Sequence, residues 1–130
     1  MRVAHFILFV TDQEASTHFY AAALDRSPRL HVPGMSEFDM PGGAVLGLMP
    51  AAGIRRLLGE VLPDPAAASG IPRSELYLLV DDAAACLARA EAAGARLISP
   101  VMSRDWGHEA GYALDLDGHL LAFAQLGGGS

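Results

Sequence analysis

Two side chains able to do chemistry stand at matching places of a repeated sequence. His5 opens the apolar run His5–Val10, and Glu75 opens the run Glu75–Val80, seventy residues later. An imidazole and a carboxylate can both bind a metal ion, transfer a proton or hold a polar ligand. A carboxylate on an apolar strand is costly to bury alone, so Glu75 is expected to have a partner: His5, an arginine, a ligand or water.

Strand alternation and loop position add aromatic candidates. Residues two apart on a strand share a face, so Tyr77 lies on the face of Glu75. Trp106 lies on a predicted loop before a strand, where an aromatic ring that the core does not need can stack on a ligand. Phe38 and Met40, on a short predicted strand, are further candidates.

The remaining reactive side chains have plainer interpretations. His108 and His119 flank predicted turns and are expected to be solvated. Cys86 belongs to the inward stripe of a predicted helix and behaves there as a small hydrophobe, because nothing near it in sequence would lower its pKa.

The repeat predicts the elements that position these residues, and the fold class is α+β. Each copy is a β-α-β-β-β module, and neither is large enough to bury a strong core alone. The first strand is expected to be covered on both faces, and the first helix to begin at a Thr11 cap with Ala15, Phe19 and Ala22 or Ala23 inward. In the first module, strands are expected at 3–10, 29–32, 37–40 and 44–49, and the helix is expected to end at 24. In the second module, strands are expected at 75–80, 96–98, 109–116 and 119–125, and the helix is expected to run from Asp81 or Asp82 to 94.

The length fits a single domain over residues 1–130. Its parts are expected to be module one (1–50), a connector (51–72) with a short helix over 54–61, module two (73–126) and a flexible tail (127–130).

Composition narrows the class of protein. The net charge is −6, all nine basic residues are arginines and no basic cluster occurs, which argues against nucleic-acid binding. No apolar run approaches the roughly 20 residues that span a bilayer. A single cysteine excludes an intrachain disulfide framework, and the start of the chain does not look like a signal peptide. We therefore expect no membrane partner and a cytoplasmic location.

Two motifs carry a resemblance to a known superfamily. Asp-x-Glu-Ala-Ser-x-x-Phe-Tyr at residues 12–20 and Asp-Leu-Asp-Gly-His-Leu-Leu-Ala at residues 115–122, together with the repeat, resemble the vicinal oxygen chelate superfamily. That superfamily includes glyoxalase I, bleomycin-resistance proteins, extradiol dioxygenases and fosfomycin-resistance enzymes. The resemblance implies two pseudo-symmetric modules that form a curved sheet around a cleft, in a homodimer.

The resemblance also implies where a metal would bind. Metal-dependent relatives place ligands on the first and last strands of each module, positions that fall here on His5, Gly47, Glu75 and Ala122. Glycine and alanine cannot ligate, and two ligands are fewer than the three that catalytic metal sites usually keep. No cofactor is therefore expected, and any weakly held divalent metal would be on His5 and Glu75.

Three functions remain open from the sequence. The first is a metal-independent, bleomycin-resistance-like protein that binds or sequesters a small apolar or aromatic molecule. The second is a glyoxalase-like lyase or isomerase that uses a weakly held divalent metal or proton transfer. The third is an interaction domain whose cleft is filled by its own side chains. For the first, the ligand-binding residues are predicted to be His5, Phe38, Met40, Gly47, Glu75, Tyr77, Trp106 and Ala122.

Overall fold

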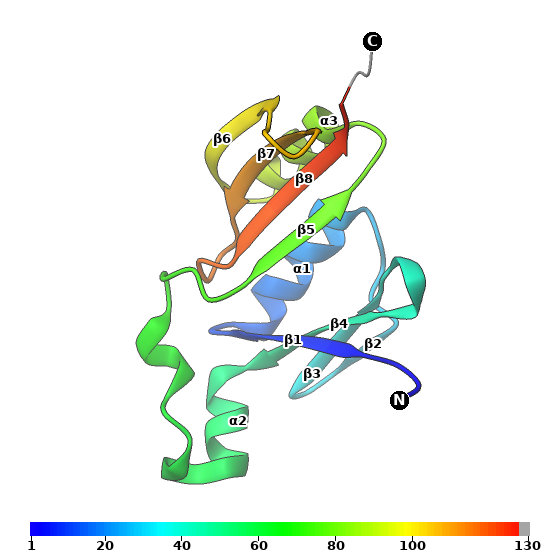
Figure 1. The fold of residues 1–130 in the computed structure, drawn as a ribbon. Helices are drawn as coiled ribbons and strands as arrows, with labels where there is room; N and C mark the ends of the chain where they lie inside the picture. Colours follow the sequence, from blue (N-terminus) through cyan, green and yellow to red (C-terminus); the bar gives the residue numbers. More distant parts are fainter. Residues whose placement is uncertain (128–130) are drawn as a thin grey trace. The chain divides into compact units, whose positions relative to one another are not determined.

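The chain forms two sheets of the same topology. The computed structural model describes residues 1–127 (Figure 1). The strands form two four-stranded sheets, ordered β1-β4-β3-β2 and β5-β8-β7-β6. The elements are β1 (His5–Val10), α1 (Gln13–Leu24), β2 (Leu30–Val32), β3 (Met35–Asp39), η1 (Pro41–Gly43), β4 (Val45–Pro50), α2 (Ala51–Leu58), η2 (Gly59–Val61), η3 (Pro65–Ala68), β5 (Glu75–Leu79), α3 (Ala83–Ala92), β6 (Arg96–Ser103), β7 (His108–Leu114) and β8 (Leu120–Leu126).

The predicted α+β class and its two repeated modules are confirmed. In each sheet the first strand pairs in parallel with the last strand of its module, β1 with β4 and β5 with β8. The remaining pairs are antiparallel. Contacts group the chain into two compact units, one of Met1–Ala21 and Asp25–Ser69, the other of Ala22–Leu24 and the residues from Gly70 onward.

An aspartate begins the main helix of each module at the same place in the repeat. The Ala15 amide donates to Asp12 Oδ1 at 3.0 Å, and the Ala85 amide donates to Asp82 Oδ1 at 3.0 Å. Each carboxylate thus satisfies an amide that the first helical turn leaves without a partner. The predicted Asp82 cap is confirmed, whereas the Thr11 cap is wrong: the neighbouring Asp12 caps α1.

The core of the first module comes from the middle of its sheet. Phe38, Leu46 and Leu48 are fully buried on one face. On α1 the buried side chains are Ser16, Thr17, Phe19, Tyr20 and Ala23. The inward placement of Phe19 and of Ala22 or Ala23 is therefore confirmed, by Ala23 for the second, and that of Ala15 is wrong.

The strand β1 is more exposed than its apolar sequence predicts. It stands at the edge of its sheet, and Phe6 and Ile7 are 62% and 40% exposed. A continuous apolar run occurs both in strands with a neighbour on each side and in edge strands, because either kind of strand buries a hydrophobic face. The run therefore does not predict which position the strand takes in its sheet.

In the second module α3 packs on β7 through a glycine. Leu87 and Ala90 of α3 are buried as predicted, while Cys86 is half-buried. A Cβ at Gly111 would lie 2.6 Å from Leu87 and 3.0 Å from Val101, so only glycine lets both side chains approach the strand so closely. β6 extends to Ser103, well beyond the predicted Ile98, because irregularities between Leu97 and Met102 carry it past Pro100.

The connector and the end of the chain differ slightly from expectation. The predicted helix over 54–61 is present as α2 followed by η2. The Gly127 amide donates to the Gly107 carbonyl at 3.0 Å, which ties the first residue of the predicted tail, and residues 128–130 lie outside the described part. Within residues 1–127 no helix is both long and apolar enough to cross a membrane.

A glycine pair tests the packing at β7. We expect Gly111→Ala to lower the free energy of unfolding by about 1–3 kcal/mol, because the new methyl overpacks against Leu87 and Val101. Gly53→Ala, in α2, is the matched control: its methyl meets only Met49 at 3.7 Å, and helix propensity favours alanine by up to about 1 kcal/mol. Urea melts measure both, and equal stabilities of the two variants would contradict the packing.

Candidate functional site

The first module places its charged side chains on the sheet face opposite Phe38. His5 and Ile7 share that face, and Ile7 pairs with Gly47, which in turn pairs with Glu37 of β3. The alternation of the strands therefore puts Glu37 beside the position where the resemblance leads one to expect a ligand on β4.

An ion-pair cluster of His5, Arg29, Glu37 and Asp39 covers this face. His5 Nδ1 lies 3.5 Å from Glu37 Oε2, Arg29 Nε donates to Glu37 Oε1 at 3.0 Å, and Arg29 Nη1 donates to Asp39 Oδ1 at 3.1 Å. Hydrogen bonding, first to Glu37 and then to Asp39, raises the pKa of the Arg29 guanidinium above its usual value. The cluster therefore holds a permanent cation among its carboxylates.

Sequence reasoning missed Glu37 and Arg29. The signal was present: pairing the predicted strands 37–40 and 44–49 across the Gly42–Gly43 turn brings Glu37 opposite Gly47. The repeat predicts a pairing of Glu75 with His5 instead, because it makes those two positions equivalent.

The space above Gly47 is already filled. A Cβ at Gly47 would meet Ile7 Cγ1 at 3.0 Å and Met35 Sδ at 3.3 Å. Gly47 therefore offers no open space, since the two neighbouring side chains occupy the place that a ligating residue would take.

Phe38 does not share the surface of His5. It pairs with Leu46, lies on the opposite face of the sheet and has no exposed area. Its predicted ligand contact is wrong, because the two faces of a strand alternate and Phe38 belongs to the core. Met40 is half-buried one residue beyond β3, where its amide donates to the Ala44 carbonyl at 2.9 Å.

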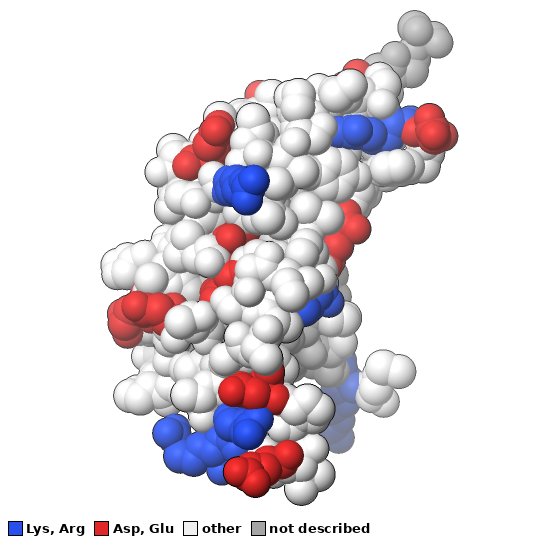
Figure 2. All heavy atoms as spheres, turned by 90° about the vertical axis from the view of Figure 1, so that its left-hand side faces the viewer, with Lys and Arg blue, Asp and Glu red and all other residues white. Residues whose placement is uncertain are grey.

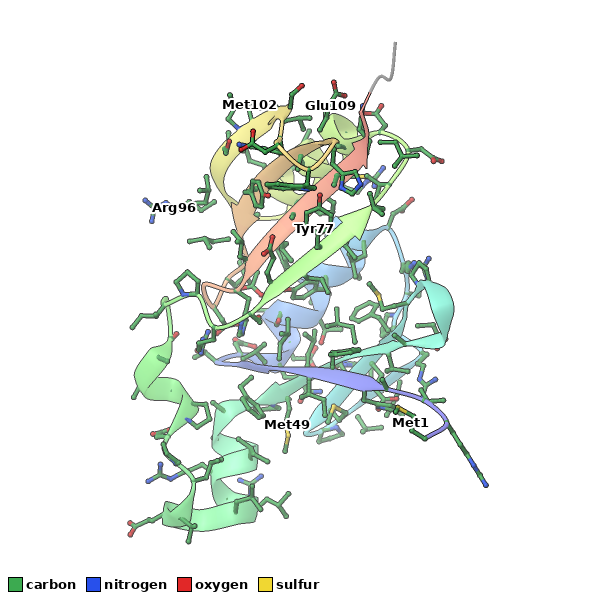
Figure 3. All side chains as sticks on the ribbon, in the orientation of Figure 1. Met1, Met49, Tyr77, Arg96, Met102 and Glu109 are labelled. Carbon is green, nitrogen blue, oxygen red and sulfur yellow. The ribbon has the colours of Figure 1, made fainter. Side chains whose placement is uncertain are left out.

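The second module holds an aromatic cluster on the equivalent face, formed by Tyr77, Trp106 and His108. Tyr77 projects from β5 (Figure 3). Its Oη lies 2.6 Å from His108 Nδ1 and accepts a hydrogen bond of 2.7 Å from Trp106 Nε1. The Tyr77 and His108 rings are 5.8 Å apart and tilted by 31°. Two predicted site residues, Tyr77 and Trp106, are thus brought together.

His108 joins this cluster against expectation. It was expected to be solvated, yet it is half-buried and bonded to Tyr77. The sequence carries only a weak signal: His108 precedes Tyr112 by four residues, so both can share a strand face. His108 comes near Tyr77 only in the folded sheet, where β8 pairs with β7 on one side and with β5 on the other.

Ala122 lies between two tyrosines on this face. It pairs with Tyr77 on one side and with Tyr112 on the other, and it is fully buried. Ala122 therefore has no surface accessible to solvent. The Arg104 guanidinium lies 5.1 Å above the centre of the Tyr112 ring, a distance at which a cation is attracted by the ring.

Glu75 is exposed at the start of β5, so its charge does not need the partner that the sequence argument required. It acts electrostatically on Tyr112. Burial is the main cause that raises the pKa of Tyr112, the negative charge of Glu75 raises it further, and Arg104 opposes both.

His119 is a structural residue of the turn after β7. It is 4% exposed; its Nδ1 lies 3.0 Å from Ser74 Oγ and its Nε2 lies 3.3 Å from Arg73 Nη2. The amides of Asp117 and His119 both donate to Asp115 Oδ1 at 2.9 Å. The expectation that His119 is solvated is wrong, because the motif at residues 115–122 forms a bonded turn.

The residues present do not fit the metal site that the resemblance implies. In the first module His5 and Glu37 are close enough to share an ion, but Glu37 and Asp39 both bind the Arg29 guanidinium, which opposes a divalent cation. Across residues 1–127 no group of three or more His, Cys, Asp or Glu side chains is arranged to hold a metal.

Charges of both signs are interspersed on the surface seen in Figure 2. Neither the arginines nor the acidic residues form an extended patch on that face. A basic stripe of the kind that tracks a nucleic-acid backbone is therefore not a feature of that face.

Comparison with known proteins establishes the family. The sequence profile of the Glyoxalase/Bleomycin resistance protein/Dioxygenase superfamily matches residues 2–123. The chain belongs to this superfamily. The resemblance seen in the sequence is thereby confirmed. A search of curated proteins gives no match.

Solved structures agree with this membership. A glyoxalase-related enzyme from Fulvimarina pelagi is 27% identical, with a TM-score of 0.80 over 94% of this chain and 86% of that one. A glyoxalase/bleomycin resistance protein/dioxygenase from Nocardioides is 22% identical, with a TM-score of 0.77 over 98% and 84%. A family enzyme from Burkholderia phytofirmans PsJN is 18% identical, with a TM-score of 0.77 over 95% and 97%. The last two support the fold alone.

The raised pKa of Tyr112 predicts an alkaline loss of stability. A phenol whose pKa is higher in the folded than in the unfolded chain stabilises the fold below pH about 10, and this contribution is lost as the pH rises through the folded pKa. Glu75→Gln should lower the pKa of Tyr112 and reduce that loss. Absorbance at 295 nm, with Tyr112→Phe to assign the transition, measures the pKa; an unchanged value in Glu75→Gln would refute the coupling.

Proposed function

We propose that this superfamily member binds a small apolar or aromatic molecule without a metal, in the manner of a bleomycin-resistance protein. The observation that carries the proposal is the state of Trp106. Its indole is 56% exposed, yet its nitrogen is held by Tyr77 Oη at 2.7 Å. An exposed aromatic side chain that is also fixed in orientation is suited to stacking on a planar guest.

The energetics favour such a guest. Stacked aromatic pairs contribute about 0.5–1.5 kcal/mol beyond the burial of their area. Because the hydrogen bond to Tyr77 already restricts the indole, less side-chain entropy is lost when the guest binds. Tyr77 and His108 extend the aromatic surface beside Trp106.

The first module supports a metal-independent mode. The carboxylate nearest to His5 belongs to Glu37, and it already accepts a hydrogen bond from the Arg29 guanidinium. Ile7 and Met35 fill the space over Gly47. The homodimer and the cytoplasmic location expected from the sequence belong to the same proposal.

A glyoxalase-like lyase or isomerase with a weakly held divalent metal is the second candidate. It is favoured by the likeness to the Fulvimarina pelagi protein, which is described as a glyoxalase-related enzyme and is 27% identical over most of both chains. Proton transfer by such an enzyme would need a base near the substrate, and His5 is the imidazole that lies beside Glu37 in the first module.

Trp106 reports directly on ligand binding, because it is the single tryptophan. We expect a member of a panel of planar aromatic compounds, including glycopeptide and quinone antibiotics, to quench or shift its emission at sub-millimolar concentration. Trp106→Ala should weaken the binding of that compound about 2–10-fold, which corresponds to the free energy of one aromatic stacking contact. If dye displacement detects binding while the emission stays constant, the guest does not contact Trp106.

Metal content separates the two candidates. Protein purified without an affinity tag should contain far less than one transition-metal ion per chain, because Glu37 is held by Arg29 and Gly47 and Ala122 offer no ligand. Elemental analysis checks this. About one ion per chain, lost in His5→Ala, Glu37→Gln or Glu75→Ala, would establish the metal-dependent candidate instead.

A further inference from the structure

The hydrogen bonds of Trp106 and His108 meet at the Tyr77 oxygen. An indole nitrogen is a donor only, so Trp106 Nε1 donates to Tyr77 Oη at 2.7 Å. One lone pair of the phenol is therefore used, and the phenol keeps its own proton to donate.

The second bond can continue in the same sense. Tyr77 Oη and His108 Nδ1 are 2.6 Å apart, within reach for the phenol to donate its proton to an unprotonated ring nitrogen; the imidazole tautomer decides the direction. When Tyr77 is the donor, the ring proton of His108 is on Nε2.

The consequence is that the last group of this series of hydrogen bonds, His108 Nε2, is a donor. His108 is half-buried, and no other residue within 1–127 bonds its ring. Its imidazole and the exposed Trp106 indole both bond the same oxygen, so the two rings are neighbours. A guest stacked on Trp106 lies within the surroundings of that imidazole.

We propose that His108 Nε2 donates a hydrogen bond to a carbonyl oxygen of the guest, and that the ligand class is the neutral planar aromatic ketones, including quinones. This inference rests on the proposed function and names its ligand class. A neutral acceptor is favoured over a carboxylate, because Glu75 is negative enough at this face to act on Tyr112 and the whole chain carries −6. Tyr77 is a positioning residue that sets the tautomer of His108.

The series of hydrogen bonds explains why all three residues are needed to recognise the carbonyl. Without the Tyr77 hydroxyl, Nδ1 has no donor facing it and either imidazole tautomer is allowed. With it, one tautomer is selected before the guest arrives, and hydrogen bonds in a chain polarise one another in the same sense.

A pair of probes that differ in one group tests the inference. 9-Fluorenone and fluorene are flat, neutral and of nearly the same shape, but only fluorenone carries a carbonyl. Titrations followed by Trp106 emission should show that wild-type protein binds fluorenone about 3–10-fold more tightly, the usual effect of one hydrogen bond.

Substitutions at His108 assign the donor. His108→Asn places an amide near the Nδ1 position, which keeps an acceptor for Tyr77 but removes the Nε2 donor, so the preference for fluorenone should disappear. His108→Gln extends an amide N–H toward the Nε2 position and should keep part of the preference. Tyr77→Phe should reduce the preference, measured as the ratio of the two affinities; both affinities should also fall, because this variant loses the hydrogen bond that fixes Trp106. Circular dichroism melts confirm that each variant is folded.

The tautomer has its own readout. Two-bond proton–nitrogen spectra of the protein should assign His108 as the Nε2–H form in wild type, and Tyr77→Phe should shift it toward a mixture. An Nδ1–H ring in the wild type would overturn the direction of the chain, whatever the probes show.

The outcomes separate the two proposals. Equal affinity of wild type for both probes overturns the carbonyl inference and leaves the binding function standing. A preference that survives in His108→Asn assigns the donor to another group and overturns the role of His108. If neither probe binds, by emission or by calorimetry, the carbonyl inference fails, whereas the aromatic-binding function fails only if no compound of the panel binds.

Discussion

The register of the two parallel strand pairs is the constraint on which the rest of the structure depends. Pairing of β1 with β4 and of β5 with β8 fixes which residues share a face, because side chains alternate along each strand. A slip by one residue would turn His5 and Tyr77 toward the opposite faces and bring Phe6 and Leu76 in their place. The charged and aromatic clusters therefore exist only in this register.

The same topology supports different chemistry in each module. In the first, the face carries ion pairs around Arg29, which neutralise the carboxylates. In the second, it carries hydrogen-bonded rings around Tyr77. Both faces lack the side chains at β4 and β8 that would complete a metal site. Ile7 and Met35 fill the space beside Gly47, and Ala122, which pairs with Tyr77 and Tyr112, is fully buried. Membership of the superfamily gives the fold, whereas the chemistry depends on these local replacements.

The elements were predictable because their signals are local. An aspartate before an alanine-rich segment and an apolar run on either side are read within a few residues, and both features occur in each copy of the repeat. The errors occurred where a local pattern has two solutions. Thr11 and Asp12 can both cap a helix, and an apolar strand can stand in the middle or at the edge of a sheet, as β1 does.

The site was predictable only in part, for a related reason. The sequence by itself determined the α+β class, the two modules and the superfamily, because these follow from periodicity, repetition and motif. Tertiary structure alone decided that His5 meets Glu37, that Phe38 turns into the core, that Glu75 is exposed and that His108 reaches Tyr77. Each of these contacts or burials depends on which strands pair and in which register, and register is a property of the folded sheet rather than of any short segment.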